Sequence, residues 1–313
     1  MDERLRVMAA RQGGVFSRRQ ALDAGFHHEQ IVRSLKTGRW EQIRRGQYAE
    51  TADLGALPSW ERLRRTHLRQ VHAVLNALRP ESVAVSHQSA LILHGLPTWG
   101  LDLSKVHVTR LDGQSGGVVA GVQHHLGRLT ADDLTTVGGR PVTTAVRAAV
   151  DSACTASFEV AVVGVDAALR AGRVSDDEVR RLTGAIEFWP GSVAARRALR
   201  FGNGLSESVG ESRLRVLMSE YGLPEPMLQV GFRDRHGFVG RVDFHLPAYE
   251  TVIEFDGAVK YGGGSPDVLV GEKYREDRLR ALGLKVVRTT WSDFDNRPAL
   301  AATLHRALLR RSA

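Results

Sequence analysis

Four carboxylates lie within one short stretch of the sequence, Arg241–Asp256 (RVDFHLPAYETVIEFD), and three of them stand in its two alternating runs. Alternation with period two is typical of half-buried strands, and it places Asp243 on one face of the first run and Glu254 with Asp256 on one face of the second. The residues between the two runs, 247–250, are few enough to predict an antiparallel hairpin. The three carboxylates then crowd one face of that hairpin.

Like charges on neighbouring strands repel each other, so this face needs an explanation. A hard cation such as Mg²⁺ would resolve the repulsion, because it prefers oxygen ligands and is usually held by one or two carboxylates. The alternative is that the acidic side chains simply face solvent, which is common on antiparallel hairpins. The stretch alone favours neither interpretation.

The elements around the hairpin must position these carboxylates. A helix is predicted from residue 207 or 208 to 221, and the hairpin is followed by a charged helix at about 269–282, a strand at 285–288 and a helix from Pro298. The predicted order is helix, three strands, helix, strand, helix. In the first helix, Glu211 either completes a capping box that begins at Ser208 or belongs to the acidic site, and the two roles do not exclude each other.

Five ordered motifs, GESRLR, RVDFHLP, VIEFDGAVKY, EKYREDRLRALG and VVRTTW, resemble the Vsr-like endonuclease domain of the PD-(D/E)XK superfamily over about residues 206–296. The resemblance implies a restriction-endonuclease-like domain with a central mixed sheet flanked by helices. It implies that Asp243 and Glu254 coordinate Mg²⁺ or Mn²⁺ with Glu211 nearby. The expected activity is metal-dependent DNA cleavage in DNA repair or defence, because a metal neutralises charge on the phosphate and lowers the pKa of a water.

The sequence departs from the superfamily where a lysine commonly follows the metal-binding glutamate by two residues, because Asp256 stands there. The group that activates water is therefore open. Lys260 at the strand end is the first candidate, His245 on the face of Asp243 is the second, and Lys273 on the following helix is the third.

The helix at 272–280 (EKYREDRLR) alternates positive and negative charges. Such a pattern is typical of a solvated face stabilised by pairs four residues apart, such as Glu276 with Arg280. In the resembling domains this helix borders the site, so Arg278 is expected to hold a phosphate, and Arg288 and Trp291 are expected to contact DNA.

Residues 1–57 predict a winged helix-turn-helix with helices at about 3–11, 18–24 and 27–37 and a hairpin at 40–49. The third helix would enter a major groove and the hairpin would contact phosphates. The alternative is a small helical domain that packs on the rest of the chain or on another protein. The cations expected at the DNA are Arg18, Arg33, Lys36, Arg39, Arg44 and Arg45.

Net charge supports a polyanionic partner. The chain carries 43 Lys and Arg against 35 Asp and Glu, a formal charge of +8, and its pI is near 10.1. Such an excess suggests nucleic acid first. No apolar run is long enough for a membrane span and the first residues are charged, so we expect a cytoplasmic protein without a membrane partner.

Residues 58–205 predict a middle α/β domain, which makes the whole chain mixed α/β (α+β) with a third domain at 206–313. Its histidines lie on different predicted elements without a spacing of four residues, so we interpret them as surface or core-edge side chains rather than a metal site. These histidines are His87, His94, His107, His124 and His125.

The winged helix together with the segments SHQSALILHGLP and PVTTAVRAAVDSA resembles the AbiEi-like type IV antitoxins over about residues 1–150. Members of that family bind promoter DNA and repress their own operons. The resemblance implies an alternative function, an antitoxin-like repressor with a toxin or a second copy as partner, whose nuclease-fold domain only binds DNA or that partner. Asp256 in the usual lysine position favours this alternative.

Overall fold

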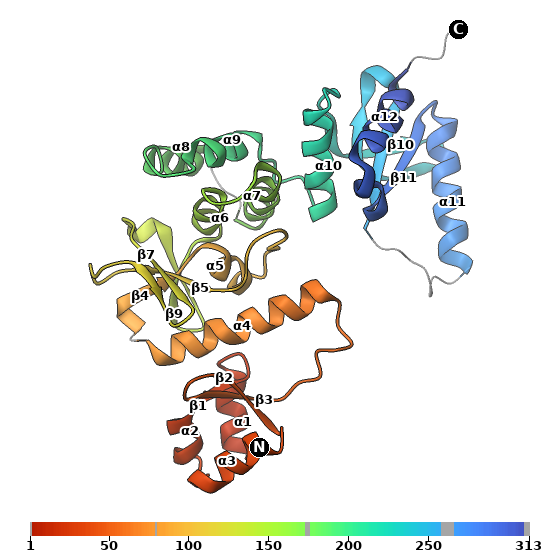
Figure 1. Cartoon of the computed structure of the whole chain (residues 1–313). Coiled ribbons are helices and arrows are strands. Elements are labelled where there is room, and N and C mark those ends of the chain that lie inside the picture. Colours follow the sequence, from red (N-terminus) through yellow and green to blue (C-terminus); the bar gives the residue numbers. More distant parts are fainter. Residues whose placement is uncertain (1, 79, 173–175, 258–265, 310–313) are drawn as a thin grey trace. The chain divides into compact units, whose positions relative to one another are not determined.

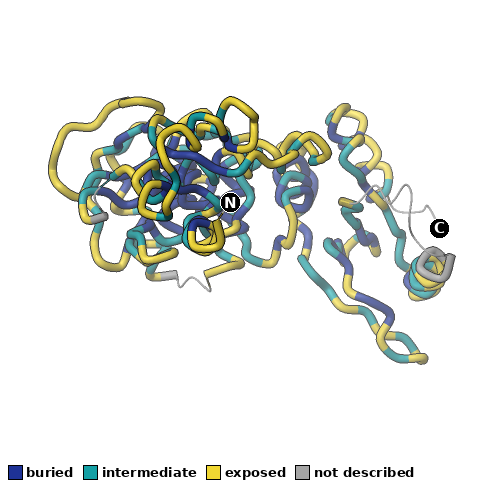
Figure 2. Tube along the Cα trace, turned by 90° about the horizontal axis from the view of Figure 1, so that it is seen from below, coloured by how far each residue is buried: buried dark blue, intermediate teal, exposed yellow. Residues whose placement is uncertain are grey.

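The computed structural model describes residues 2–78, 80–172, 176–257 and 266–309 (Figure 1). The chain divides into two compact units: the first comprises Met1–Gly164 and Val174–Arg197, and the second Val165–Arg173 and Ala198–Ala313. Helices and three sheets make up the described residues, which confirms the predicted mixed α+β class. Each unit contains buried residues (Figure 2).

The N-terminal elements form a winged helix-turn-helix. The three predicted helices are present and end within two residues of their expected bounds, because local signals fix them: Ser17 Oγ accepts the N–H of Gln20 at 3.1 Å while Gln20 Oε1 accepts the N–H of Ser17 at 2.7 Å. The elements are α1 (Glu3–Ala10), β1 (Val15–Ser17), α2 (Arg18–Asp23), α3 (His28–Lys36), β2 (Trp40–Arg44) and β3 (Gln47–Glu50).

The wing is a three-stranded antiparallel sheet in the order β1-β3-β2, of which only the β2–β3 hairpin was predicted. Its core places Phe16 edge-on against Trp40, with ring centroids 4.7 Å apart, and packs Leu5 and Ile31 against them. These buried side chains pack α1 and α3 against the wing.

A six-stranded sheet in the order β6-β7-β5-β4-β9-β8 is the centre of the middle region. The pairs β5–β7 and β4–β9 are parallel and the others antiparallel. Its strands are β4 (Val83–Val85), β5 (Val106–Arg110), β6 (Gly117–Val119), β7 (Val122–His125), β8 (Leu134–Val137) and β9 (Arg140–Thr143). The helices of this part of the chain are α4 (Ser59–Ala77), α5 (His87–Leu93), α6 (Ala145–Ala153), α7 (Phe158–Gly172), α8 (Asp176–Ala185) and α9 (Ser192–Phe201).

The last elements follow the predicted order of helix, three strands, helix, strand, helix. They are α10 (Val209–Glu220), β10 (Met227–Asp234), β11 (Gly237–Leu246), β12 (Thr251–Asp256), α11 (Pro266–Ala281), β13 (Lys285–Thr290) and α12 (Arg297–Leu308). The sheet β10-β11-β12-β13 is mixed, because β12 and β13 run parallel and the other pairs antiparallel. Short 3-10 turns occupy Pro80–Ser82, Ala131–Asp133, Pro247–Tyr249 and Trp291–Asn296.

The predicted hairpin is present. His245 pairs with Val252 and Phe244 with Ile253, so the polar face that carries Asp243 and His245 continues onto the face of Glu254 in β12. The opposite face buries Phe244 and Ile253 in the core of this unit. In the described residues no helix is long and apolar enough to cross a membrane.

Candidate functional site

The predicted DNA-contacting cations of α3 and the wing face solvent. Arg33, Lys36, Arg39 and Arg45 are all exposed, and within the described residues none of them makes an ion pair or a side-chain hydrogen bond. Arg18 at the start of α2 is also exposed, and its Nη2 lies 2.5 Å from His28 Nδ1. These side chains can therefore approach phosphates without first breaking an internal pair.

Arg44 differs from the other five cations. It is half-buried and lines a pocket together with Ile43, Gln70 and Val74. Arg44 is therefore less open to solvent than its neighbour Arg45, and of the six predicted cations it is the least available to a phosphate.

The acidic site begins with Glu211 in the first turn of α10, whose side chain is buried. Ser208 Oγ accepts the N–H of Glu211 at 3.1 Å, as the capping-box prediction required. The second half of that prediction was wrong: Glu211 Oε2 accepts the N–H of Glu207 at 2.8 Å, not that of Ser208. The same oxygen accepts a hydrogen bond from Gln229 Nε2 at 3.0 Å. This bond connects Glu211 to strand β10 of the sheet.

Gln229 is the residue of this site that the sequence did not reveal. Its backbone lies in the left-handed region at φ 56°, which is rare outside glycine and is usually found where a site constrains the chain. Besides bonding Glu211, its side chain lies near Asp243 and lowers the pKa of that carboxyl group. Gln229 therefore lies between a helix carboxylate and a strand carboxylate.

Asp243 and Glu254 are held by different partners. Asp243 Oδ2 accepts the N–H of Phe255 at 2.7 Å. Glu254 Oε1 lies 2.8 Å from Arg275 Nη2, and Glu254 Oε2 lies 3.8 Å from Arg288 Nε. The two arginines supply the positive charge that the hairpin requires.

Burial raises the pKa of all three carboxyl groups. Desolvation is the largest cause at Glu211, Asp243 and Glu254, and the proximity of Asp243 raises the pKa of the other two further. A carboxylate whose pKa is raised in the folded state gains more from a bound cation than a solvated one does. The ionised forms of these three carboxyl groups are therefore electrostatically unfavourable in the folded protein.

Asp256 and the candidates for activating water that the structure describes, His245 and Lys273, have different surroundings. Asp256 lies 3.8 Å from Arg288 Nη1. His245 is half-buried and packs edge-on against Phe232 at 5.0 Å, and burial lowers the pKa of its imidazole. Lys273 is exposed on α11. Lys260 lies outside the described residues.

Arg278 pairs with Asp234, which is not one of the predicted metal ligands. Its Nε and Nη2 donate to the two oxygens of Asp234 at 2.7 and 2.6 Å, and this pairing holds the pKa of Asp234 well below its usual range. Arg275 is the α11 cation that contacts Glu254 instead. Arg275 stands four residues before Leu279, which is fully buried, so the two side chains lie on the same side of α11.

Other charged and aromatic side chains of α11 and β13, and of the turn after β13, also have partners within the fold. The pair of Arg280 with Glu276 is confirmed at 2.5 Å. Besides its contacts with the hairpin, Arg288 forms ion pairs with Glu272 and Glu276, each at 3.2 Å. Trp291 donates its indole N–H to the carbonyl of Gly257 at 2.9 Å.

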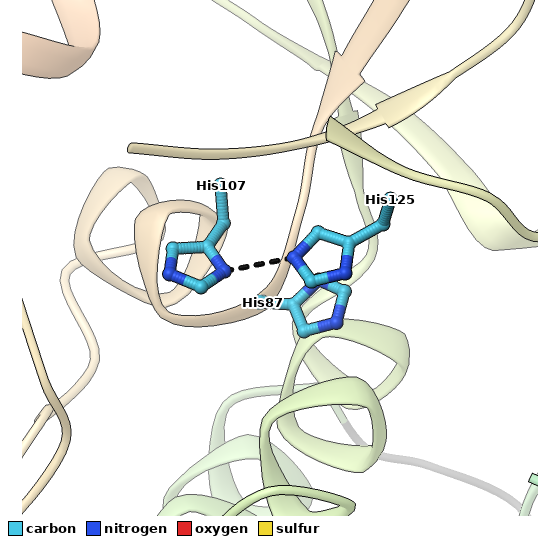
Figure 3. A group of neighbouring side chains, drawn as sticks. All are labelled: His87, His107 and His125. Carbon is cyan, nitrogen blue, oxygen red and sulfur yellow. Dashed lines mark hydrogen bonds between the residues drawn. The ribbon is translucent and has the colours of Figure 1, made fainter. Parts of the chain in front are cut away.

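The structure brings three of the middle-region histidines together. His87, His107 and His125 lie together, with one ring nitrogen of each within 4.8 Å of the others (Figure 3). Separate elements do not keep them apart, because β5 and β7 are parallel neighbours and α5 starts beside them. Among the described residues this trio is the group of three with metal-ligand spacing, whereas the carboxylates do not approach one another so closely.

Comparison with known proteins bears on the N-terminal elements. Two uncharacterized proteins from strains of Mycobacterium tuberculosis are each 33% identical over 175 residues, which is 56% of this chain and 64% of theirs. The match thus spans less than two thirds of those relatives. Residues 3–51 match the family described as transcriptional regulator, AbiEi antitoxin. The winged helix-turn-helix of this chain is therefore similar to the AbiEi antitoxin family over these residues.

Proposed function

We propose that the protein is a DNA-binding transcriptional regulator of the antitoxin type. The observation that carries this proposal is the row of exposed cations on α3 and the wing, which make no ion pair within the described residues. They lie in the residues that match the AbiEi antitoxin family. A toxin or a second copy of the chain would be the protein partner, and promoter DNA the nucleic acid.

The geometry suggests how the duplex would be read. In winged helices, the second helix of the helix-turn-helix enters the major groove and its N-terminal residues reach base edges. Here that helix is α3, which begins with exposed His28 and Glu29 and ends with Lys36. The cations would position the protein on phosphates, and the first turn of α3 would supply base contacts.

Fluorescence anisotropy with a duplex from upstream of the coding sequence tests this proposal. Arg33→Ala and Lys36→Ala are each expected to weaken binding roughly tenfold, because each removes a phosphate contact. Arg62→Ala, which removes an exposed cation from α4, is the matched control and should bind as wild type. Equal affinity of all four proteins would contradict the proposal, as would a wild type that binds no duplex.

A second candidate is a metal-dependent deoxyribonuclease in the second unit. The specific observation in its favour is that Asp243 and Glu254 share one face of the sheet, while Gln229, a residue with a left-handed backbone, bonds the nearby Glu211. The resemblance to Vsr-like domains supports the same site. In a nuclease, this acidic face would hold the metal ion to which the phosphate that is cut binds.

The donor chemistry fits Mg²⁺ or Mn²⁺, which prefer carboxylate oxygens. Asp243 and Glu254 would hold the ion, with Glu211 alongside. The metal, when bound, would neutralise phosphate charge and lower the pKa of an attacking water. Arg275 presently holds Glu254, so it would have to move to the phosphate as the ion enters.

Plasmid cleavage in Mg²⁺ or Mn²⁺ tests the second candidate. Asp243→Asn and Glu254→Gln are each expected to reduce the cleavage rate by a factor of about 100 or more, because each removes a proposed ligand. Glu225→Gln neutralises an exposed carboxylate just before β10 and should leave cleavage unchanged. Cleavage that survives in both site variants would come from a contaminant and would exclude this candidate, as would its complete absence in wild type.

A further inference from the structure

Three imidazoles meet on one face of the six-stranded sheet. His107 lies on β5 and His125 ends β7, and the parallel register pairs Thr109 with His125. Because side chains two residues apart share a face of a strand, His107 and His125 point to the same side. His87, at the first position of α5, is stacked on His125 with ring centroids 3.7 Å apart (Figure 3).

The three rings are close enough to share one ion. His107 Nδ1 lies 2.8 Å from His125 Nε2. His87 is buried, with 6% of its surface exposed, while the other two are half-buried. The trio therefore has a buried side, formed by His87, and a more open side.

The backbone at His87 is unusual for its residue type. Its φ is 52°, in the left-handed region that β-carbon crowding disfavours for residues other than glycine. Such conformations persist where the surrounding structure holds them and cluster at functional sites. Ser86 Oγ lies 3.0 Å from His87 Nδ1, which leaves Nε2 as the ring nitrogen without this partner.

A second layer of polar groups orients His107. Gln88 Nε2 lies 2.8 Å from His107 Nε2 and also donates to the carbonyl of Asp102 at 2.9 Å. Ser89 Oγ accepts the backbone N–H of His107 at 2.8 Å. Partners on the outer ring nitrogen are the usual means of fixing a metal-binding imidazole.

One buried atom of this layer has no hydrogen bond. Gln88 Oε1 is without a partner among the described residues, which is costly for a buried oxygen. If His107 binds a metal through Nδ1, its proton must sit on Nε2. Rotation of the Gln88 amide would bring Oε1 to that proton, in exchange for the hydrogen bond that Nε2 donates to the Asp102 carbonyl.

We propose that His87, His107 and His125 form a Zn²⁺ site. Neutral imidazole nitrogens suit zinc and other late transition metals, and the trio includes no carboxylate that would favour Mg²⁺ or Ca²⁺. Three protein ligands leave a fourth position for water or another ligand. Ring nitrogens bound to one tetrahedral zinc lie about 3.3 Å apart, so His107 and His125 need to separate by only a few tenths of an ångström from their hydrogen-bonded distance.

Zinc binding to the tag-free, full-length protein tests the proposal. After removal of metal with a chelator, we expect one equivalent of Zn²⁺ to bind per chain by calorimetry and elemental analysis. His107→Gln and His125→Gln are each expected to weaken binding by a factor of about 100 or more, and Gln88→Ala by about 10. His124→Gln changes the neighbouring residue on the other face of β7 and is the matched control, which should keep the full equivalent.

A second measurement requires no variant and so does not depend on whether each one folds. X-ray absorption of the zinc-loaded wild type is expected to show three imidazole nitrogens around the ion. An oxygen-only shell would place the zinc at carboxylates and overturn the assignment. Wild type that binds no zinc would do the same, as would folded His107→Gln and His125→Gln variants that bind it fully.

Discussion

At the scale of single residues, Glu211 shows how a buried carboxylate can be both well bonded and electrostatically costly. One of its oxygens, Oε2, accepts hydrogen bonds from the Glu207 N–H and from Gln229 Nε2. Even so, burial raises the pKa of the carboxyl group, because desolvation outweighs these bonds. Ionised Glu211 therefore opposes folding, which is the condition expected of a residue retained for a role other than stability.

Glu211→Gln tests this balance through the pH dependence of stability. The amide oxygen can take the place of Oε2 and keep both hydrogen bonds, so the variant removes the charge alone. Because the folded pKa of Glu211 is raised, wild type loses stability as pH rises from the unfolded pKa through the folded one, and the variant does not.

Thermal unfolding should therefore show equal Tm values near pH 4 and a higher Tm for the variant at pH 7, by roughly 3 °C for a change of about 1 kcal/mol. Gln229→Glu is the opposite change and should lower the Tm at pH 7, since it adds a third charge beside Glu211 and Asp243. A Glu211→Gln variant that is less stable than wild type at pH 7 would show that the ionised carboxylate is favourable in the fold.

The same residues show what the sequence could not reveal about the site. Asp243 and Glu254 were predicted to share a face, because strand alternation and a short turn determine that relation locally. Gln229 and Arg275 come from β10 and α11, and their contacts depend on how three elements pack. A lone glutamine in a strand and an arginine in a charged helix carry no pattern that announces such partners.

At the scale of elements, prediction succeeded where the signal was local. The helices of the winged domain and α10 were located by their caps and apolar spacing, and the acidic hairpin by its alternation. β1 was missed because three residues are too few to show a period, and β1 is a strand only through its pairing with β3. The histidine trio was missed for a related reason: its proximity follows from the parallel register of β5 and β7.

The position of a side chain within its helix or strand also determines whether it is exposed to solvent. Leu63 in α4 is 59% exposed, and the buried residues of that helix begin at His67. Arg44 and Arg45 are adjacent on the wing, and only Arg45 is fully open to solvent. Composition alone treats such neighbours as equivalent, whereas strand alternation and packing do not.

At the scale of the whole molecule, the excess of positive charge belongs to the whole chain, but only some of its cations are free to contact DNA. The chain carries a formal charge of +8, and many of its cations are already engaged, as Arg275 and Arg278 are with Glu254 and Asp234. Paired cations release few counterions on binding DNA, because their charge is already neutralised. The exposed cations of α3 and the wing should therefore determine how salt affects DNA binding.

The salt dependence of the dissociation constant measures this use of charge. Four phosphate contacts, one each from Arg33, Lys36, Arg39 and Arg45, predict that the logarithm of the association constant falls with the logarithm of salt concentration with a slope of about −4. Arg39→Ala combined with Arg45→Ala should reduce the slope to about −2, while Arg62→Ala should leave it unchanged. A slope far steeper than −4, or one that the wing substitutions do not alter, would mean that the phosphates are held by other cations of the chain and that the winged helix is not the principal DNA-binding surface.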